Sequence, residues 1–156
     1  MAKKEETRYV SENLFEGIVS FRALIDIQGG AHNTRKIKKV YMMMKKVLIV
    51  DDDSINCMLA KHALVEDYDV VTVNSGSEAL NFLKKEIPDL VLMDIEMPEM
   101  DGKTVVRKIK SYEKWSKIPV IFLTADTSPI TEADCLQCGA DDFITKPFVV
   151  DVMRRR

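Results

Sequence analysis

Residues 89–102 of the chain read DLVLMDIEMPEMDG. An apolar run, Leu90–Met93, ends in a carboxylate at Asp94, and a loop marked by Pro98 and Gly102 follows. A short apolar run bounded by turn residues is typical of a strand that is buried on both faces. Asp94 therefore either begins a turn or belongs to a site at the end of that strand, and the other strand ends decide between the two.

From Lys45 onward, strand-like and helix-like segments alternate five times. Alternation of this kind predicts an α/β fold, with one parallel sheet that carries helices on both faces. The predicted strands are Val47–Val50, Val70–Val73, Leu90–Met93, Pro119–Leu123 and a short one at Phe143–Ile144. The predicted helices run from Ser54 to about Glu66, from Ser75, from Gly102, from Pro129 behind an N-cap at Ser128, and from Phe148.

Local signals support two of these helices. Ile55, Leu59 and Ala63 recur every four residues, which is a helical spacing. Ser75 and Glu78 form a capping box, in which the serine hydroxyl accepts from a backbone N–H and the glutamate reaches back to another. Each of these helices begins within a few residues of the end of a predicted strand.

Composition excludes several classes of protein. The 156 residues are 46% hydrophobic and 31% charged, with a formal net charge of −2, and so fit a globular domain without the excess of basic residues that nucleic-acid binding favours. No apolar run is long enough to cross a bilayer, and the first residues lack the apolar core of a signal peptide. We therefore expect a cytoplasmic protein with no membrane partner and no direct contact with nucleic acid.

The three cysteines do not indicate a disulfide framework. Cys135 and Cys138 form a C-x-x-C, but they fall at the end of a helical pattern just before Gly139, and the chain holds no second pair of ligands for zinc. We interpret them as ordinary helix residues, with Gly139 in a left-handed position that ends the helix.

Polar side chains follow four of the five predicted strands. Asp51–Asp53 follow the first strand, Asp94 and Thr124 end the third and fourth, and Lys146 follows the fifth. Because the carboxyl ends of parallel strands meet at one edge of a sheet, these side chains should lie together. Clustered carboxylates repel one another, and Mg²⁺ is a hard cation that suits a few carboxylates together with retained water. Asp53 alone is equally well explained as a helix cap.

These motifs together closely resemble the receiver domain of two-component response regulators, over about Lys45 to Phe148. The motifs are Val-Asp51-Asp52, the stretch from Met93 to Gly102, Leu-Thr124-Ala125 and Lys146-Pro147-Phe148. The resemblance implies a flavodoxin-like, doubly wound sheet of five parallel strands in the order 2-1-3-4-5.

The resemblance also implies roles for individual residues. Asp94 would be the phosphoacceptor, and Lys146 would precede a cis proline. The metal, Mg²⁺ or alternatively Mn²⁺, would be held by Asp51, Asp52, Asp94 and the backbone carbonyl of Glu96. Thr124, the Ala125 backbone and Lys146 would contact the phosphoryl group, Thr124 and Phe143 would form the switch, and Glu96 and Asp126 would tune the lifetime of the phosphorylated state.

The implied function is a phosphorelay receiver rather than an enzyme acting on other substrates. It would accept a phosphoryl group from a sensor histidine kinase or a phosphotransfer protein and then act on a downstream output domain or protein. Two alternatives stay open: a magnesium-dependent phosphatase of the haloacid-dehalogenase type, and a receiver-like module that binds partners without phosphorylation. The motif of the phosphatase family is Asp-x-Asp-x-Thr/Val, whereas this chain has Ile55 at the last of those positions.

The chain divides into an extension at 1–44, of unknown role, and a receiver domain at 45–156. Within the extension, Val19–Ile27 fits a strand or a helix about equally well. The stretch that follows Phe148 predicts a last helix shorter than is usual in the family, and hence a regulator whose output domain is either severed or lacking.

Overall fold

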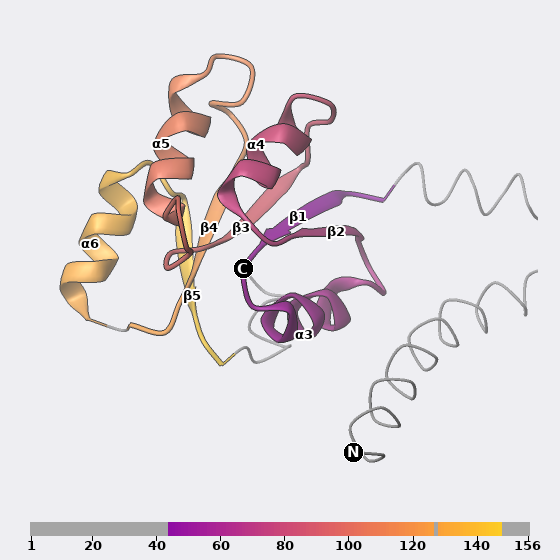
Figure 1. Ribbon diagram of the computed structural model, residues 1–156, viewed down its shortest axis with the longest axis horizontal. Helices are drawn as coiled ribbons and strands as arrows, with labels where there is room; N and C mark the ends of the chain where they lie inside the picture. Colours follow the sequence, from indigo (N-terminus) through magenta and orange to yellow (C-terminus); the bar gives the residue numbers. More distant parts are fainter. Residues whose placement is uncertain (1–43, 127, 148–156) are drawn as a thin grey trace, which may run out of the picture. The chain divides into compact units, whose positions relative to one another are not determined.

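A computed structural model describes residues 44–126 and 128–147 (Figure 1). The predicted extension, apart from Met44, and the predicted short last helix lie outside these residues. The division of the chain at Lys45 therefore stays a prediction.

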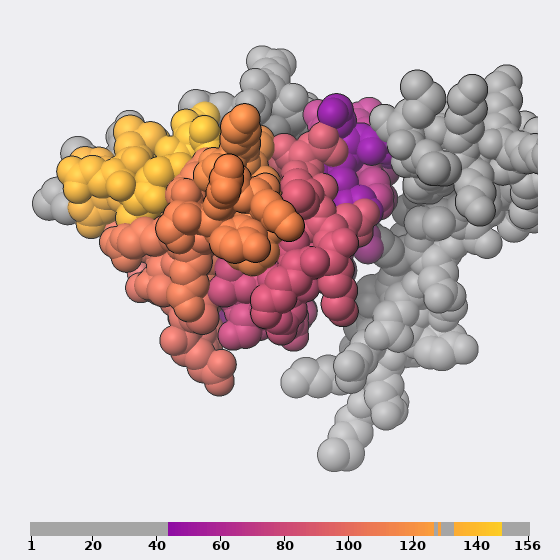
Figure 2. Space-filling model, turned by 90° about the horizontal axis from the view of Figure 1, so that it is seen from above, coloured from indigo at the N-terminus to yellow at the C-terminus, as the bar shows by residue number. Residues whose placement is uncertain are grey.

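Five parallel strands form one sheet in the order β2-β1-β3-β4-β5, as the sequence resemblance predicts (Figure 1). β3 lies at the centre, and β2 and β5 form the edges. In the view of Figure 2 the later elements, coloured orange and yellow, gather on one side and the earlier ones on the other, in keeping with this order. The strands are β1 (Lys46–Val50), β2 (Asp69–Val73), β3 (Leu90–Asp94), β4 (Val120–Thr124) and β5 (Asp142–Thr145).

Helices cover both faces of the sheet, and each face has its own apolar core. α4 (Gly76–Leu83) and α5 (Gly102–Ser111) pack on one face, where Phe122 of β4 is fully buried. α3 (Ser54–Leu64) packs on the other face. α6 (Pro129–Gln137) precedes β5. Cys135 of α6 and Cys138, one residue past the end of this helix, are buried free thiols in the core on the α4–α5 face.

The face that α3 turns to the sheet differs from the one its sequence indicates. Ile55 and Leu59 are 61% and 51% exposed, and the buried residues include Cys57 and Ala60 instead. Apolar periodicity gives the helical repeat, but α3 has two stripes with apolar residues, and the stripe that contains Cys57 and Ala60 is the one that packs on the sheet. The expectation of a helix was therefore right, but two of the three residues that support it point outward.

Side-chain caps begin α3, α4 and α5, and the caps are Asp53, Ser75 and Asp101. Asp53 accepts from the Ile55 N–H (2.8 Å), and Ser75 Oγ accepts from the Glu78 N–H (3.2 Å). The Glu78 carboxylate reaches back to the N–H of Asn74 (2.9 Å), one residue before the cap. The predicted capping box is therefore present, shifted by one residue in its return bond.

Two glycines are required by the backbone that surrounds them. A Cβ on Gly102 would lie 2.0 Å from the carbonyl oxygen of Asp94, so only glycine lets α5 begin this close to the end of β3. Gly139 has φ +93°, a conformation that L-amino acids with a side chain rarely adopt. The left-handed position predicted for Gly139 is confirmed.

Asp101→Ala is expected to lower the free energy of unfolding by about 1 kcal/mol, because the Asp101 carboxylate caps α5 through the Thr104 N–H at 2.6 Å. Hydrogen bonding to Thr104 also lowers the pKa of Asp101. The stability due to its charge is therefore present above the unfolded-state pKa and is lost as the pH falls through the folded-state value. Urea unfolding at neutral and acid pH measures both effects. Asp101→Asn, which keeps an acceptor oxygen, should retain most of the stability at neutral pH, and equal losses in both variants would contradict the capping role.

Among the described residues, no helix is long and apolar enough to cross a membrane.

Candidate functional site

The register of the sheet brings the predicted site residues together along one edge, the one where the carboxyl ends of the strands lie. Val50 of β1 lies opposite Met93 of β3, so the residues that follow them, Asp51 and Asp94, stand level with each other. Thr124 ends β4, the neighbour of β3 on its other side. These three are the buried polar or charged residues of the described part of the chain, with exposed fractions of 0%, 7% and 5%. Burial of a charge is costly unless it is paired, so this edge calls for cations.

Three carboxylates gather at this edge. One oxygen from each of Asp51, Asp52 and Asp94 lies within 4.8 Å of the others, and Asp52 is exposed whereas Asp51 and Asp94 are buried. A cluster of carboxylate oxygens that is open on one side matches the ligand preference of Mg²⁺, which keeps several waters. The donor set therefore fits the metal that the sequence predicts.

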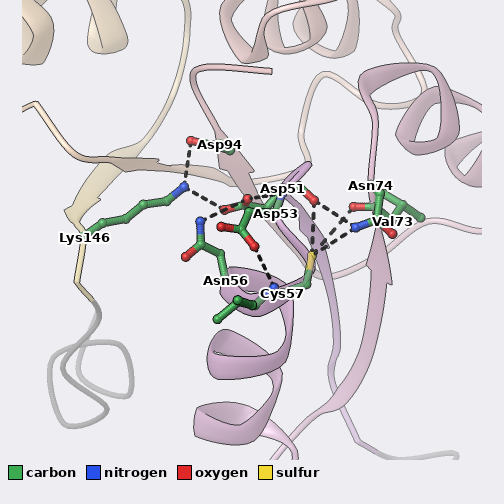
Figure 3. A network of polar contacts seen from close by, with 9 residues as sticks. Asp51, Asp53, Asn56, Cys57, Val73, Asn74, Asp94 and Lys146 are labelled. Atoms are coloured by element: carbon green, nitrogen blue, oxygen red, sulfur yellow. Dashed lines mark hydrogen bonds and ion pairs between the residues drawn. The ribbon is translucent and has the colours of Figure 1, made fainter. Parts of the chain in front are cut away.

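One ammonium group is shared between the two buried carboxylates. Lys146 Nζ lies 2.7 Å from Asp51 Oδ2 and 3.0 Å from Asp94 Oδ1, and its side chain is 15% exposed (Figure 3). Its backbone is held to β4 by the bond from Lys146 N–H to the Thr124 carbonyl at 2.7 Å. When all three carboxylates are ionised, three negative charges face one positive charge, and an excess of two negative charges remains.

Burial and direct contacts determine the pKa values of Asp94 and Lys146. Burial raises the pKa of Asp94 and the nearby Asp51 charge raises it further, while the hydrogen bond from Lys146 opposes both. Burial alone would lower the pKa of Lys146, but its bonds to Asp51 and Asp94 outweigh burial, so its pKa is raised. Lys146 therefore remains protonated, and Asp94 carries a less stable charge than a surface aspartate.

Asp51 is held by residues that sequence reasoning missed, Asn56, Cys57 and Asn74. The Asp51 carboxylate accepts from the Asp53 N–H (2.9 Å) and from Asn56 Nδ2 (3.3 Å). Its backbone carbonyl accepts from Asn74 Nδ2 (3.2 Å) and from the Cys57 thiol (3.3 Å), whose pKa is raised to about 11 by burial. Asn56 and Cys57 lie in the first turn of the helix that follows Asp51, and this position is the sequence signal that could have found them.

The remaining predicted residues lie around the ends of β3, β4 and β5. The Thr124 hydroxyl donates to the Asp126 carbonyl (3.1 Å) and accepts from the Asp126 N–H (3.0 Å). Ala125 and Glu96 are exposed, and Phe143 is half-buried against the core on the α4–α5 face. The peptide bond between Lys146 and Pro147 is cis, as the resemblance predicts.

The sequence of the chain matches the response regulator receiver domain over residues 47–156. The chain belongs to this family. This receiver domain is 38% identical over 109 residues to the regulatory protein AtoC of Escherichia coli (strain K12), a match that covers 69% of this chain and 23% of AtoC. It is 44% identical over 105 residues to the probable transcriptional regulator ycf27 of Guillardia theta, covering 67% of this chain and 40% of that relative.

Solved structures agree with the assignment. The receiver domain is similar to the signal receiver domain of a signal transduction histidine kinase from Syntrophus aciditrophicus, with a TM-score of 0.66 and 41% identity, over 71% of this chain and 85% of that one. It is also similar to the chemotaxis response regulator CheY4 of Vibrio cholerae, with a TM-score of 0.69 and 31% identity, over 72% of this chain and 95% of CheY4.

Family membership decides against the haloacid-dehalogenase interpretation, because the chain is a signalling receiver of the two-component class. The matched stretch spans less than half of the two curated regulators named above.

Proposed function

We propose that this receiver accepts a phosphoryl group on Asp94, with Mg²⁺ bound beside it, and that the phosphorylated form engages an output domain or protein. The observation that carries the proposal is the excess of carboxylate charge at the edge of the sheet, where Asp51, Asp52 and Asp94 face the single ammonium group of Lys146. A purely structural cluster would pair its buried charges or replace them with apolar side chains.

The metal would be held by side-chain oxygens of Asp51, Asp52 and Asp94 and by the backbone carbonyl of Glu96, with Mn²⁺ as an alternative ion. When bound, a divalent cation neutralises the charge that builds up on the transferring phosphoryl oxygens. Asp52 and Glu96 are exposed, which leaves room for retained water at the outer side of the site.

In the transfer step, a carboxylate oxygen of Asp94 attacks the phosphorus of a phosphohistidine. A P–O bond forms, the P–N bond breaks, and the imidazole leaves with its electron pair. The transition state is loose, so positioning and charge neutralisation supply most of the catalysis. Lys146 Nζ lies 3.0 Å from Asp94 Oδ1 and can neutralise the negative charge that develops on the phosphoryl oxygens. The Thr124 hydroxyl and the Ala125 backbone would contact the oxygens of the transferred phosphoryl group.

The switch would run through Thr124 and Phe143. In this structure the Thr124 hydroxyl is bonded to the Asp126 backbone, and a phosphoryl group on Asp94 would compete for it. Movement of Thr124 toward Asp94 would leave space into which Phe143, half-buried on the edge strand β5, could turn. The alternative for Phe143 is an ordinary core aromatic, with no part in the switch.

Loss of the phosphoryl group by hydrolysis would be tuned by Glu96 and Asp126, both of which are exposed. The donor would be a sensor histidine kinase or a phosphotransfer protein. The similarity to a receiver from a signal transduction histidine kinase and to the regulator AtoC supports a place between such a kinase and an output domain.

Incubation of the protein with acetyl phosphate is expected to add one phosphoryl group per chain in the presence of Mg²⁺, and to add little or none in EDTA. Intact-mass spectrometry measures the stoichiometry. A protein that stays unlabelled at saturating Mg²⁺ would favour the alternative, a module that binds its partners without phosphorylation.

A further inference from the structure

The two oxygens of the Asp51 carboxylate have different partners (Figure 3). Oδ2 faces the interior of the site, where Lys146 Nζ lies at 2.7 Å. Oδ1 faces the first turn of α3, where it accepts from the Asp53 N–H at 2.9 Å and from Asn56 Nδ2 at 3.3 Å. The carboxylate is thus held from both sides, and the side chain is fully buried.

The orientation of this carboxylate is not set by its own torsions. The last torsion of an aspartate has broad, roughly two-fold preferences, so hydrogen-bond partners must choose the direction of each oxygen. Lys146 also binds Asp94, so its position depends on the charge at Asp94. The partners of Oδ1 are the backbone N–H of Asp53, the N-cap of α3, and the amide of Asn56 in the first turn of α3, so Asn56 is the one that acts through a side chain.

We propose that Asn56 is a positioning residue, which holds Oδ1 of Asp51 so that Oδ2 points toward Asp94 and a divalent cation. This inference rests on the proposed function of the same site. An amide donates a hydrogen bond without adding charge. Asn56 can therefore orient Asp51 and leave the charge excess of the three carboxylates available to the metal, which a lysine or arginine at the same position would reduce.

Asn56→Leu tests the proposal, because leucine is close to asparagine in size, has no donor and is a better helix former. We expect the Kd for Mg²⁺, measured by isothermal titration calorimetry on the whole 156-residue chain, to rise about tenfold, as is usual when a partner of a metal ligand is removed. The melting temperature in EDTA shows whether the variant is folded at the temperature of the titration. A merely structural role for Asn56 would leave the Kd of the folded variant for Mg²⁺ at the wild-type value, whatever the change in melting temperature.

Asn81→Leu is the matched control. Asn81 is exposed on α4, where it accepts from Lys84 Nζ at 3.0 Å, and the same substitution there should leave the Kd for Mg²⁺ at the wild-type value. Asn56→Ala, which removes the amide without adding a branched side chain, is the second variant and should show the same loss of affinity. It decides the question if Asn56→Leu has no cooperative unfolding transition.

The outcomes separate the inference from the function on which it depends. If the wild-type chain gives no heat of binding and no rise in melting temperature with Mg²⁺, the proposed metal site is wrong. If the wild type binds Mg²⁺ but a folded Asn56 variant binds it within about twofold of the wild-type Kd, the metal site stands and the role of Asn56 is overturned.

Discussion

Asp94→Asn is expected to abolish labelling by acetyl phosphate in the presence of saturating Mg²⁺. An amide cannot provide the nucleophilic oxygen anion, and Asp94 ends the central strand with Oδ1 beside the Lys146 ammonium group, where the developing charge would be neutralised. Intact-mass spectrometry after incubation with the donor measures the result. Stoichiometric labelling of this variant would show that another carboxylate accepts the phosphoryl group.

The loss of labelling should not come from unfolding. Burial raises the pKa of Asp94, so the folded state disfavours its charge at neutral pH. With the folded-state pKa above the unfolded one, any stabilising contribution of Asp94 exists below the unfolded-state pKa and is lost as the pH rises through the folded-state value. The neutral variant should therefore be at least as stable as the wild type in EDTA at neutral pH.

Asp89→Asn serves as the matched control for this substitution. Asp89 directly precedes β3, at the opposite end of that strand from Asp94, and it accepts from Lys45 Nζ and from the Lys46 N–H, both at 2.8 Å. The control should be labelled to the same extent as the wild type.

Lys146→Met is expected to lower the free energy of unfolding in EDTA by about 3 kcal/mol, at the lower end of the range for breaking a buried ion pair. The substitution keeps most of the side-chain volume but leaves the buried carboxylates of Asp51 and Asp94 without their shared cation. Urea unfolding in EDTA measures the loss. Mg²⁺ should restore a larger part of the stability in this variant than it adds to the wild type, because a divalent cation supplies the missing charge.

Lys108→Met provides the comparison, because Lys108 is exposed on α5, and this change should shift stability by less than about 0.5 kcal/mol. If Lys146→Met proves as stable as wild type in EDTA, the two carboxylates do not depend on Lys146, and the charge argument for the metal site fails with it. Some phosphorylation of Asp94 should persist in this variant, since the carboxylate nucleophile is still present.

Most of the fold follows from local features of the chain. Alternation of short apolar runs with helical patterns indicated the five strands and four helices that the structure describes. It did not indicate which face of α3 is buried. Ile55 and Leu59 have the right spacing for a packed stripe, yet both are exposed, and Cys57 and Ala60 face the sheet. The spacing of apolar residues shows that a segment is helical. Which face of the helix is buried depends on the part of the sheet against which it packs.

Part of the candidate site could also be predicted from local features of the sequence. The sequence alone determined that Asp51, Asp94, Thr124 and Lys146 stand at the carboxyl ends of parallel strands, because a strand end is a property of the adjacent residues. Tertiary structure decided that Lys146 bridges two carboxylates, one of them 95 positions away in the chain, and that Asn56 donates to the oxygen on the other side of Asp51. Contacts of this kind depend on how the strands pair and how α3 docks, and these are set by packing between segments that are distant in the sequence.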